Sequence, residues 1–117
     1  MASPVLIAAT AILTAIASPA LASPFVYTTG GLLNSDLSTC LSDAEKAAKE
    51  TGFTQDQEKA LDEDKKDGTF FASKPDAPVS LVVRCAPTYG VVTIAVSGIN
   101  NDVTFEEYGR FNKVFFK

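Results

Sequence analysis

Two stretches of alternating apolar and polar residues are the clearest feature of this chain. Residues Val79–Ala86 and Val91–Gly98 are rich in β-branched side chains, and a proline and a glycine lie between them. This pattern predicts an antiparallel hairpin. Because successive side chains of a strand point to opposite faces, one face of the hairpin is expected to be buried. That face would consist of Leu81, Val83, Cys85, Val92, Ile94 and Val96.

A first amphipathic helix is predicted over about Asp36–Thr51, where apolar residues recur at helical spacing. Ser35 is expected to cap its N-terminus, and Asp36 suits the positive end of the helix dipole. A second possible capping box at residues 42–45 would start the helix later. The earlier start is favoured because the apolar stripe already includes Leu37 and Cys40.

A second helix is predicted over about Phe105–Phe116, with Thr104 and Glu107 forming a capping box. One arc of this helix is aromatic, and we expect it to belong to the core. An exposed stripe that binds a partner is the alternative. The arc comprises Phe105, Tyr108, Phe111, Asn112, Phe115 and Phe116.

Three other segments complete the predicted fold. Phe25–Thr29 and Gly68–Ser73 are short strand candidates, and Gly30–Gly31 is expected to end the first one in a turn. Thr54–Asp67 can be an edge strand or a helical extension, and the need to complete a sheet favours the strand. The expected fold is α+β: a small antiparallel sheet of about four strands with two helices on one face, in the order β-α-β-β-β-α. This resembles a ferredoxin-like sandwich without its final strand, a likeness that implies no function.

The first 22 residues have the features of a secretory signal peptide. Val5–Ala17 is almost wholly apolar, and Ala20 and Ala22 form a small-residue cleavage site. No Lys or Arg precedes the apolar run, so an uncleaved anchor is the alternative. We expect cleavage after Ala22, which leaves residues 23–117 as a single domain that is secreted or periplasmic.

The chain contains two cysteines, Cys40 and Cys85, and export makes their pairing informative. An oxidising compartment favours a disulfide, and both residues lie on faces expected to be buried. Two unpaired buried thiols are the alternative. They are too far apart in sequence for a C-x-x-C redox motif.

The composition argues against several classes of function. The net charge is −4 and no cluster of basic residues is present, which disfavours nucleic-acid and anionic-membrane binding. The chain has no histidine, which removes the usual catalytic triads and histidine-ligated zinc. The acidic segment Asp62–Gly68 lacks the spacing of an EF-hand loop, because Ser73 stands where its last ligand would be. We therefore expect no catalytic residues, no metal and no cofactor.

Two surfaces are candidates for binding. If both helices cover one face of the sheet, the other face stays open and could hold a second copy or another exported protein. The loop before the last helix, with Asn100, Asn101 and Asp102, could hold a small polar ligand, and Tyr89 could be an exposed anchor at the hairpin tip. The open face of the hairpin would show Ser80, Val82, Arg84, Val91, Thr93, Ala95 and Ser97.

The sequence is therefore interpreted as a small exported, non-catalytic binding or interaction module of unknown ligand. A small hydrolase using carboxylates and a structural envelope component are the alternatives. The hydrolase would need two carboxyls converging in a pocket, whereas the binding module would need an exposed apolar or aromatic patch.

Overall fold

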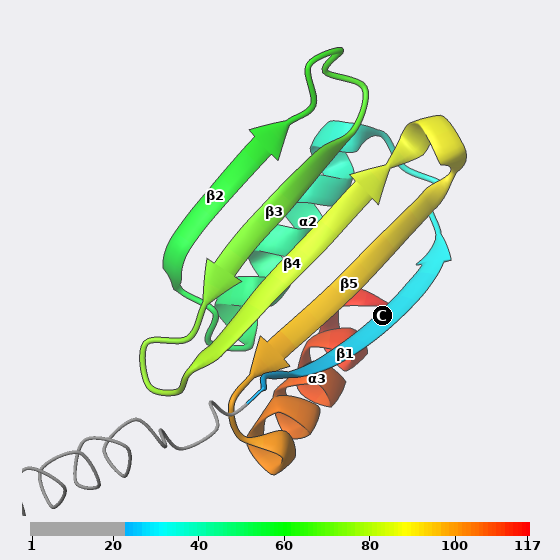
Figure 1. Ribbon diagram of the computed structural model, residues 1–117. Coiled ribbons are helices and arrows are strands. Elements are labelled where there is room, and N and C mark those ends of the chain that lie inside the picture. The colour runs from blue at the N-terminus through cyan, green and yellow to red at the C-terminus, as the bar shows by residue number, and fades with distance from the viewer. Residues whose placement is uncertain (1–22) are drawn as a thin grey trace, which may run out of the picture.

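The computed structural model describes residues 23–117. Five strands form one sheet in the order β1-β5-β4-β3-β2, and every neighbouring pair is antiparallel. Both helices cover the same face of this sheet, and its other face is open (Figure 1). Along the chain the elements are β1 (Phe25–Leu32), α2 (Leu37–Glu50), β2 (Gln55–Leu61), β3 (Gly68–Ser73), β4 (Val79–Ala86), η1 (Pro87–Tyr89), β5 (Val91–Gly98) and α3 (Asn101–Phe115).

The α+β class is confirmed, but the prediction of about four strands in the order β-α-β-β-β-α is wrong by one strand. The segment that the sequence left open contains β2, an edge strand that is almost wholly exposed. Its sequence shows no apolar alternation, because neither of its faces is buried. Backbone pairing with β3 holds the strand in place, and the register of this pairing shifts between Gln55 and Glu58. The sheet also differs from the ferredoxin-like arrangement, since β2 to β5 form a simple meander and β1 pairs with β5.

The predicted antiparallel hairpin is confirmed, and the face that was expected to be buried is buried. Leu81 pairs with Val96, Val83 with Ile94 and Cys85 with Val92. All six side chains are buried and belong to the core, together with residues of both helices. Burying one such aliphatic side chain contributes about 1.5–3 kcal/mol, so this hairpin face is the main source of stability in the sheet.

Helix α2 begins at Leu37, and the predicted cap at Ser35 is one residue early. Asp36 is the capping residue, and its carboxylate accepts a hydrogen bond from the backbone N–H of Thr39 at 2.8 Å. This hydrogen bond lowers the pKa of Asp36 below its ordinary value. The alternative start at residues 42–45 is wrong because those residues lie inside the helix.

Helix α3 begins four residues earlier than predicted. Asn100 is its cap and accepts from the backbone N–H of Val103 at 3.0 Å. The expected capping box fails because Thr104 and Glu107 lie inside the helix and are buried. The side of the helix that faces the core is therefore centred on Thr104, Glu107 and Phe111.

This rotation overturns part of the expectation that the whole aromatic arc is core. Phe111 is fully buried, but Phe105 is 56% exposed and Phe116 is 45% exposed. Tyr108 and Phe115 are partly buried against the core. The side-chain oxygen of Asn112 is buried without a hydrogen-bond partner. The alternative of an exposed aromatic stripe therefore applies to two residues of this helix.

Strand β1 is longer than predicted, because Gly30 and Gly31 continue it rather than ending it. Gly31 pairs with Val92 of β5. A Cβ atom on Gly31 would lie 3.0 Å from the ring of Phe116. The glycine is therefore needed because α3 packs closely against the strand at this point.

A buried ion pair joins the β3–β4 connection to α3. The ammonium of Lys74 lies 3.2 Å from the carboxylate of Glu107, and the two side chains are only 7% and 8% exposed. Lys74 also donates to the backbone oxygen of Thr51 at 3.2 Å and lies 5.4 Å from the centre of the Phe53 ring. One buried cation thus links the α2–β2 connection, the β3–β4 connection and helix α3.

Candidate functional site

The predicted disulfide between Cys40 and Cys85 is present, with its sulfur atoms 2.03 Å apart. Cys40 lies in the first turn of α2 and Cys85 in the central strand β4, and both are buried. The bond therefore fixes the start of α2 to the middle of the sheet. It also forms part of the wall of the pocket described next.

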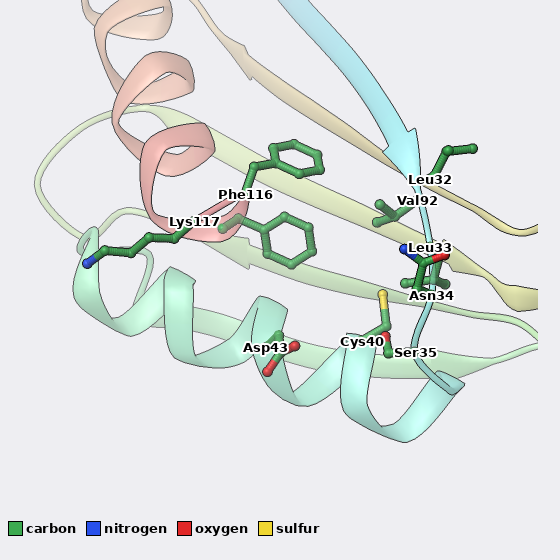
Figure 2. A pocket seen from close by; sticks show the side chains of 10 residues that line it. Leu32, Leu33, Asn34, Ser35, Cys40, Asp43, Val92, Phe116 and Lys117 are labelled. Carbon is green, nitrogen blue, oxygen red and sulfur yellow. The ribbon is translucent and has the colours of Figure 1, made fainter.

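A pocket opens at the end of the sheet where β1 leads into α2. Its volume is about 390 Å³, near the lower end of the range for small-molecule sites. Figure 2 shows the sulfur of Cys40 and the carboxylate of Asp43 on one side, with Phe116 at the end of α3 facing them. The lining residues are Leu32, Leu33, Asn34, Ser35, Cys40, Asp43, Val92, Phe115, Phe116 and Lys117.

Three segments distant in sequence build this pocket. The connection between β1 and α2 is held by the backbone N–H of Leu33, which donates to the backbone oxygen of Gly90 at 2.8 Å. The Asp36 cap then fixes the direction of α2, which places Asp43 one and a half turns into the helix. Stacking of Phe111 on Phe115, with centroids 5.6 Å apart, anchors the aromatic end of α3.

The pocket combines apolar walls with a few polar groups. Phe115, Phe116 and Leu33 supply apolar surface, whereas Ser35 and Asn34 supply hydroxyl and amide groups. Asp43 is its one carboxylate, and Lys117 is its one ammonium. In Figure 2 the Lys117 side chain runs along the rim, away from Ser35 and Cys40. Asp43 is itself exposed, so its carboxylate and the Lys117 ammonium both lie where the pocket meets solvent.

The binding residues proposed from sequence are spread over separate parts of the molecule. Tyr89 is 76% exposed in η1, at the tip of the hairpin. Asn100 caps α3, and Asn101 accepts a hydrogen bond from the hydroxyl of Tyr27. Asp102 lies in the first turn of α3 and is exposed. None of these residues lines the pocket in Figure 2.

Arg84 lies on the open face, where it binds the carboxylate of Asp62 through two nitrogens at 2.7 and 2.6 Å. This pairing lowers the pKa of Asp62 and raises the pKa of Arg84. Arg84 also donates to the hydroxyl of Thr69 at 3.2 Å. Its charge is therefore already partnered within the chain, which weakens its role as a ligand contact.

The open face itself is mixed in character. The register places Thr28, Ala95, Val82 and Phe71 in one row across β1, β5, β4 and β3. Phe71 is the one exposed aromatic residue in this row, and the neighbouring row contains the Arg84 and Thr69 pair. An antiparallel sheet can present such a surface to water without a ligand.

Three carboxyls have shifted pKa values, and every shift is downward. Hydrogen bonds from Lys59 and Lys49 lower the pKa of Glu45. A hydrogen bond from Thr39 lowers the pKa of Asp36, and hydrogen bonds from Arg84 lower the pKa of Asp62. A lowered pKa suits ion pairing rather than proton donation. Within residues 23–117, no group of three His, Cys, Asp or Glu residues is placed to hold a metal ion.

Comparison with protein-family models, curated proteins and solved structures gives no significant match. Neither helix in the described part of the chain is long and apolar enough to cross a membrane. The predicted signal peptide, Met1–Ala22, lies outside the described residues.

The pocket was not predicted from the sequence. Its residues come from the end of a strand, a connection and two helices, so no local spacing marks them as a group. The aromatic arc of the last helix was the one available signal, because Phe115 and Phe116 belong to it. Asp43 had been assigned only to a possible capping box.

Proposed function

We propose that this protein is a small exported binding module, without catalytic activity, whose ligand occupies the pocket of Figure 2. The pocket itself carries the proposal, because an apolar wall and a single carboxylate converge there. Export is supported by the apolar leader in the sequence and by the buried disulfide.

The chemistry of the pocket favours a small amphipathic amine. An apolar body of the ligand would contact Phe115, Phe116 and Leu33, and its ammonium would face the Asp43 carboxylate. Aromatic faces also attract cations, which adds to the preference for a positive ligand. An anionic ligand would have to rely on Lys117, which points along the rim.

The experiment compares phenethylammonium with phenylacetate, which share an aromatic body but differ in charge. Backbone amide signals of the protein would be followed by NMR as each probe is added. We expect millimolar binding of the ammonium probe, with the largest changes at Asn34, Ser35 and Asp43. Equal binding of the anionic probe, or changes confined to other surfaces, would refute the proposal.

A matched pair of variants isolates the role of the carboxylate. Asp43→Asn removes the carboxylate that lines the pocket, and Asp76→Asn makes the same chemical change in the β3–β4 connection, outside the pocket. Because Asp43 is exposed, loss of its contact with the ligand costs up to about 1 kcal/mol, which corresponds to roughly two- to fivefold weaker binding. We expect this loss for Asp43→Asn and none for Asp76→Asn.

A hydrolytic function would need a pair of carboxyls in a cleft. Asp62, Glu63 and Asp64 lie together, but on an exposed turn where Arg84 neutralises Asp62. The pocket of Figure 2 contains a single carboxylate. These observations support a binding function over the hydrolase alternative.

A further inference from the structure

The two edges of the sheet differ in how they are protected. Strand β2, at one edge, carries Asp56, Glu58 and Lys59, has an irregular register and includes a residue with positive φ at Asp56. Strand β1, at the other edge, has no charged residue and pairs with β5 without interruption over eight positions. Charges and bulges are devices that keep edge strands from pairing with other chains. Such devices are present on β2 and absent from β1.

The outer side of β1 offers backbone groups for a further strand. The backbone oxygen of Thr28 accepts a hydrogen bond from the hydroxyl of Tyr108, so it points away from β5. Leu33 instead directs its N–H to Gly90 on the β5 side. Because backbone groups alternate between the two sides of an antiparallel strand, the outward set is Val26, Thr28, Gly30 and Leu32.

An exposed aromatic stripe on α3 follows the same edge. Phe105 and Phe116 are the two most exposed aromatic residues of the helix. Tyr27 of β1 joins the stripe, with its ring 5.2 Å from Phe105 and 5.6 Å from Tyr108. The members Asn101, Phe105, Tyr108, Asn112 and Phe116 recur at intervals of four and three residues, which is the spacing of a helix–helix contact.

The size of this surface matches what a stable dimer needs. About half of each ring of Phe25, Phe105 and Phe116 is exposed, which gives roughly 300 Å² of aromatic surface. Val26, Leu32 and the edge backbone raise the total to about 600–800 Å² per copy. A standard protein–protein interface buries about 800 Å² per partner.

The charges of α3 suit pairing with a second copy of itself. Its exposed acids, Asp102 and Glu106, lie in the first half of the helix. Its bases, Arg110, Lys113 and Lys117, lie in the second half or just beyond it. Glu106 and Arg110 already pair with each other within the helix at 3.3 Å. In two antiparallel copies the charges that can meet across the rim are therefore Asp102 of one copy and Lys113 or Lys117 of the other, while the stripe between them carries no charge.

We propose that two copies of this protein associate through β1 in an antiparallel pair, with their α3 helices side by side beneath it. The two-fold axis passes Thr29, so that Thr28 of one copy pairs with Gly30 of the other and Val26 with Leu32. The result is a continuous sheet of twice the width, with the aromatic stripes of both α3 helices between the copies. Because Leu32 and Phe116 also line the pocket of Figure 2, that pocket borders the interface between the copies. The Thr28 oxygen can keep its bond to Tyr108, because a carbonyl accepts two hydrogen bonds.

Sedimentation of protein expressed from the full sequence tests the dimer and its surface together. We expect a dimer with Kd below about 10 µM. Phe105→Glu should weaken it at least 100-fold, whereas Tyr89→Glu, at an exposed aromatic outside the interface, should not. A monomer at 100 µM would overturn the proposal. So would a dimer that both variants leave intact, because it must use another surface such as the open face of the sheet.

Cross-linking tests the register. Thr29→Cys places two thiols across the axis in a non-hydrogen-bonded pair, where opposite side chains are closest. We expect rapid formation of a covalent dimer on mild oxidation. Thr28→Cys, one residue away on the same edge, is the matched control and should cross-link more slowly. Equal rates for the two variants would refute this register, and cross-linking to a different protein instead would show that the edge accepts a heterologous strand.

Discussion

Removing the Cys40–Cys85 disulfide should cost a large share of the stability of this protein. The bond spans a sequence separation of 45 residues. In the chain-entropy model, freeing a loop of this length raises the entropy of the unfolded chain enough to cost about 4 kcal/mol at 25 °C. Domains of this size have about 5–15 kcal/mol of total stability, so the variant Cys40→Ala/Cys85→Ala should be marginally folded.

The assay is urea unfolding followed by circular dichroism, with three samples. The samples are the oxidised protein, the same protein with a reductant, and the double variant. Comparing them separates the effect of the cross-link from the effect of the buried sulfur atoms. Reduction removes the cross-link alone, whereas the variant also removes two buried sulfur atoms and leaves a small cavity. We expect the reduced protein to lose about 4 kcal/mol and the variant somewhat more. The slope of free energy against urea should rise in both, because the unfolded chain becomes more extended.

A loss below about 1 kcal/mol in the reduced protein would refute the reasoning that the bond acts by restricting the unfolded chain. Free thiols in the purified protein, measured with a thiol reagent, would refute the pairing itself. The thiol measurement is therefore made first, on protein that has not met a reductant.

Three other changes have definite expected results. Lys74→Met should lower the free energy of unfolding by about 1–3 kcal/mol, because the buried Glu107 carboxylate keeps only its 3.4 Å contact with Arg110. Replacing Lys74 and Glu107 together by apolar residues should cost less, as thermal unfolding would show. Gly98→Ala should destabilise the protein, since its Cβ would clash with the Thr104 hydroxyl and lie 2.9 Å from the Pro78 backbone oxygen. Gly109→Ala meets open space and should stabilise α3 by about 0.5–1 kcal/mol in the same measurement. The Arg84 guanidinium lowers the pKa of Asp62 in the folded protein. The pair should therefore stabilise the fold fully above the unfolded pKa of about 3.9, and this stability should be lost as the pH falls through the lower folded pKa. Acid unfolding of Asp62→Asn should lack this component of the pH dependence.

The parts of the fold that the sequence predicts well are those whose side chains alternate between core and solvent. The β4–β5 hairpin has an apolar residue at every second position of its inner face, so its buried face and the place of its cysteine on that face could be predicted. Strand β2 has no such alternation, because it lies at an edge and its side chains are exposed. Backbone pairing with β3 determines its structure, and that pairing leaves no trace in the sequence of β2 alone.

The aromatic arc of α3 shows a second limit of sequence patterns. Periodicity identified the arc but gave it the wrong orientation, because Thr104 and Glu107 looked like capping residues. In the structure their polar groups are satisfied within the fold, by the Asn100 backbone oxygen and by Lys74. A buried polar residue with a distant partner cannot be told from an exposed one by spacing. The pocket was missed for the related reason that its walls meet only after folding.

The disulfide also has a consequence for how the chain matures. The chain has two cysteines in all, so its oxidative folding has one possible intramolecular product. No isomerase is needed to correct a wrong partner within the molecule. The other product of oxidation is a covalent link between two molecules, formed if Cys40 of one copy meets a thiol of another before β4 is in place.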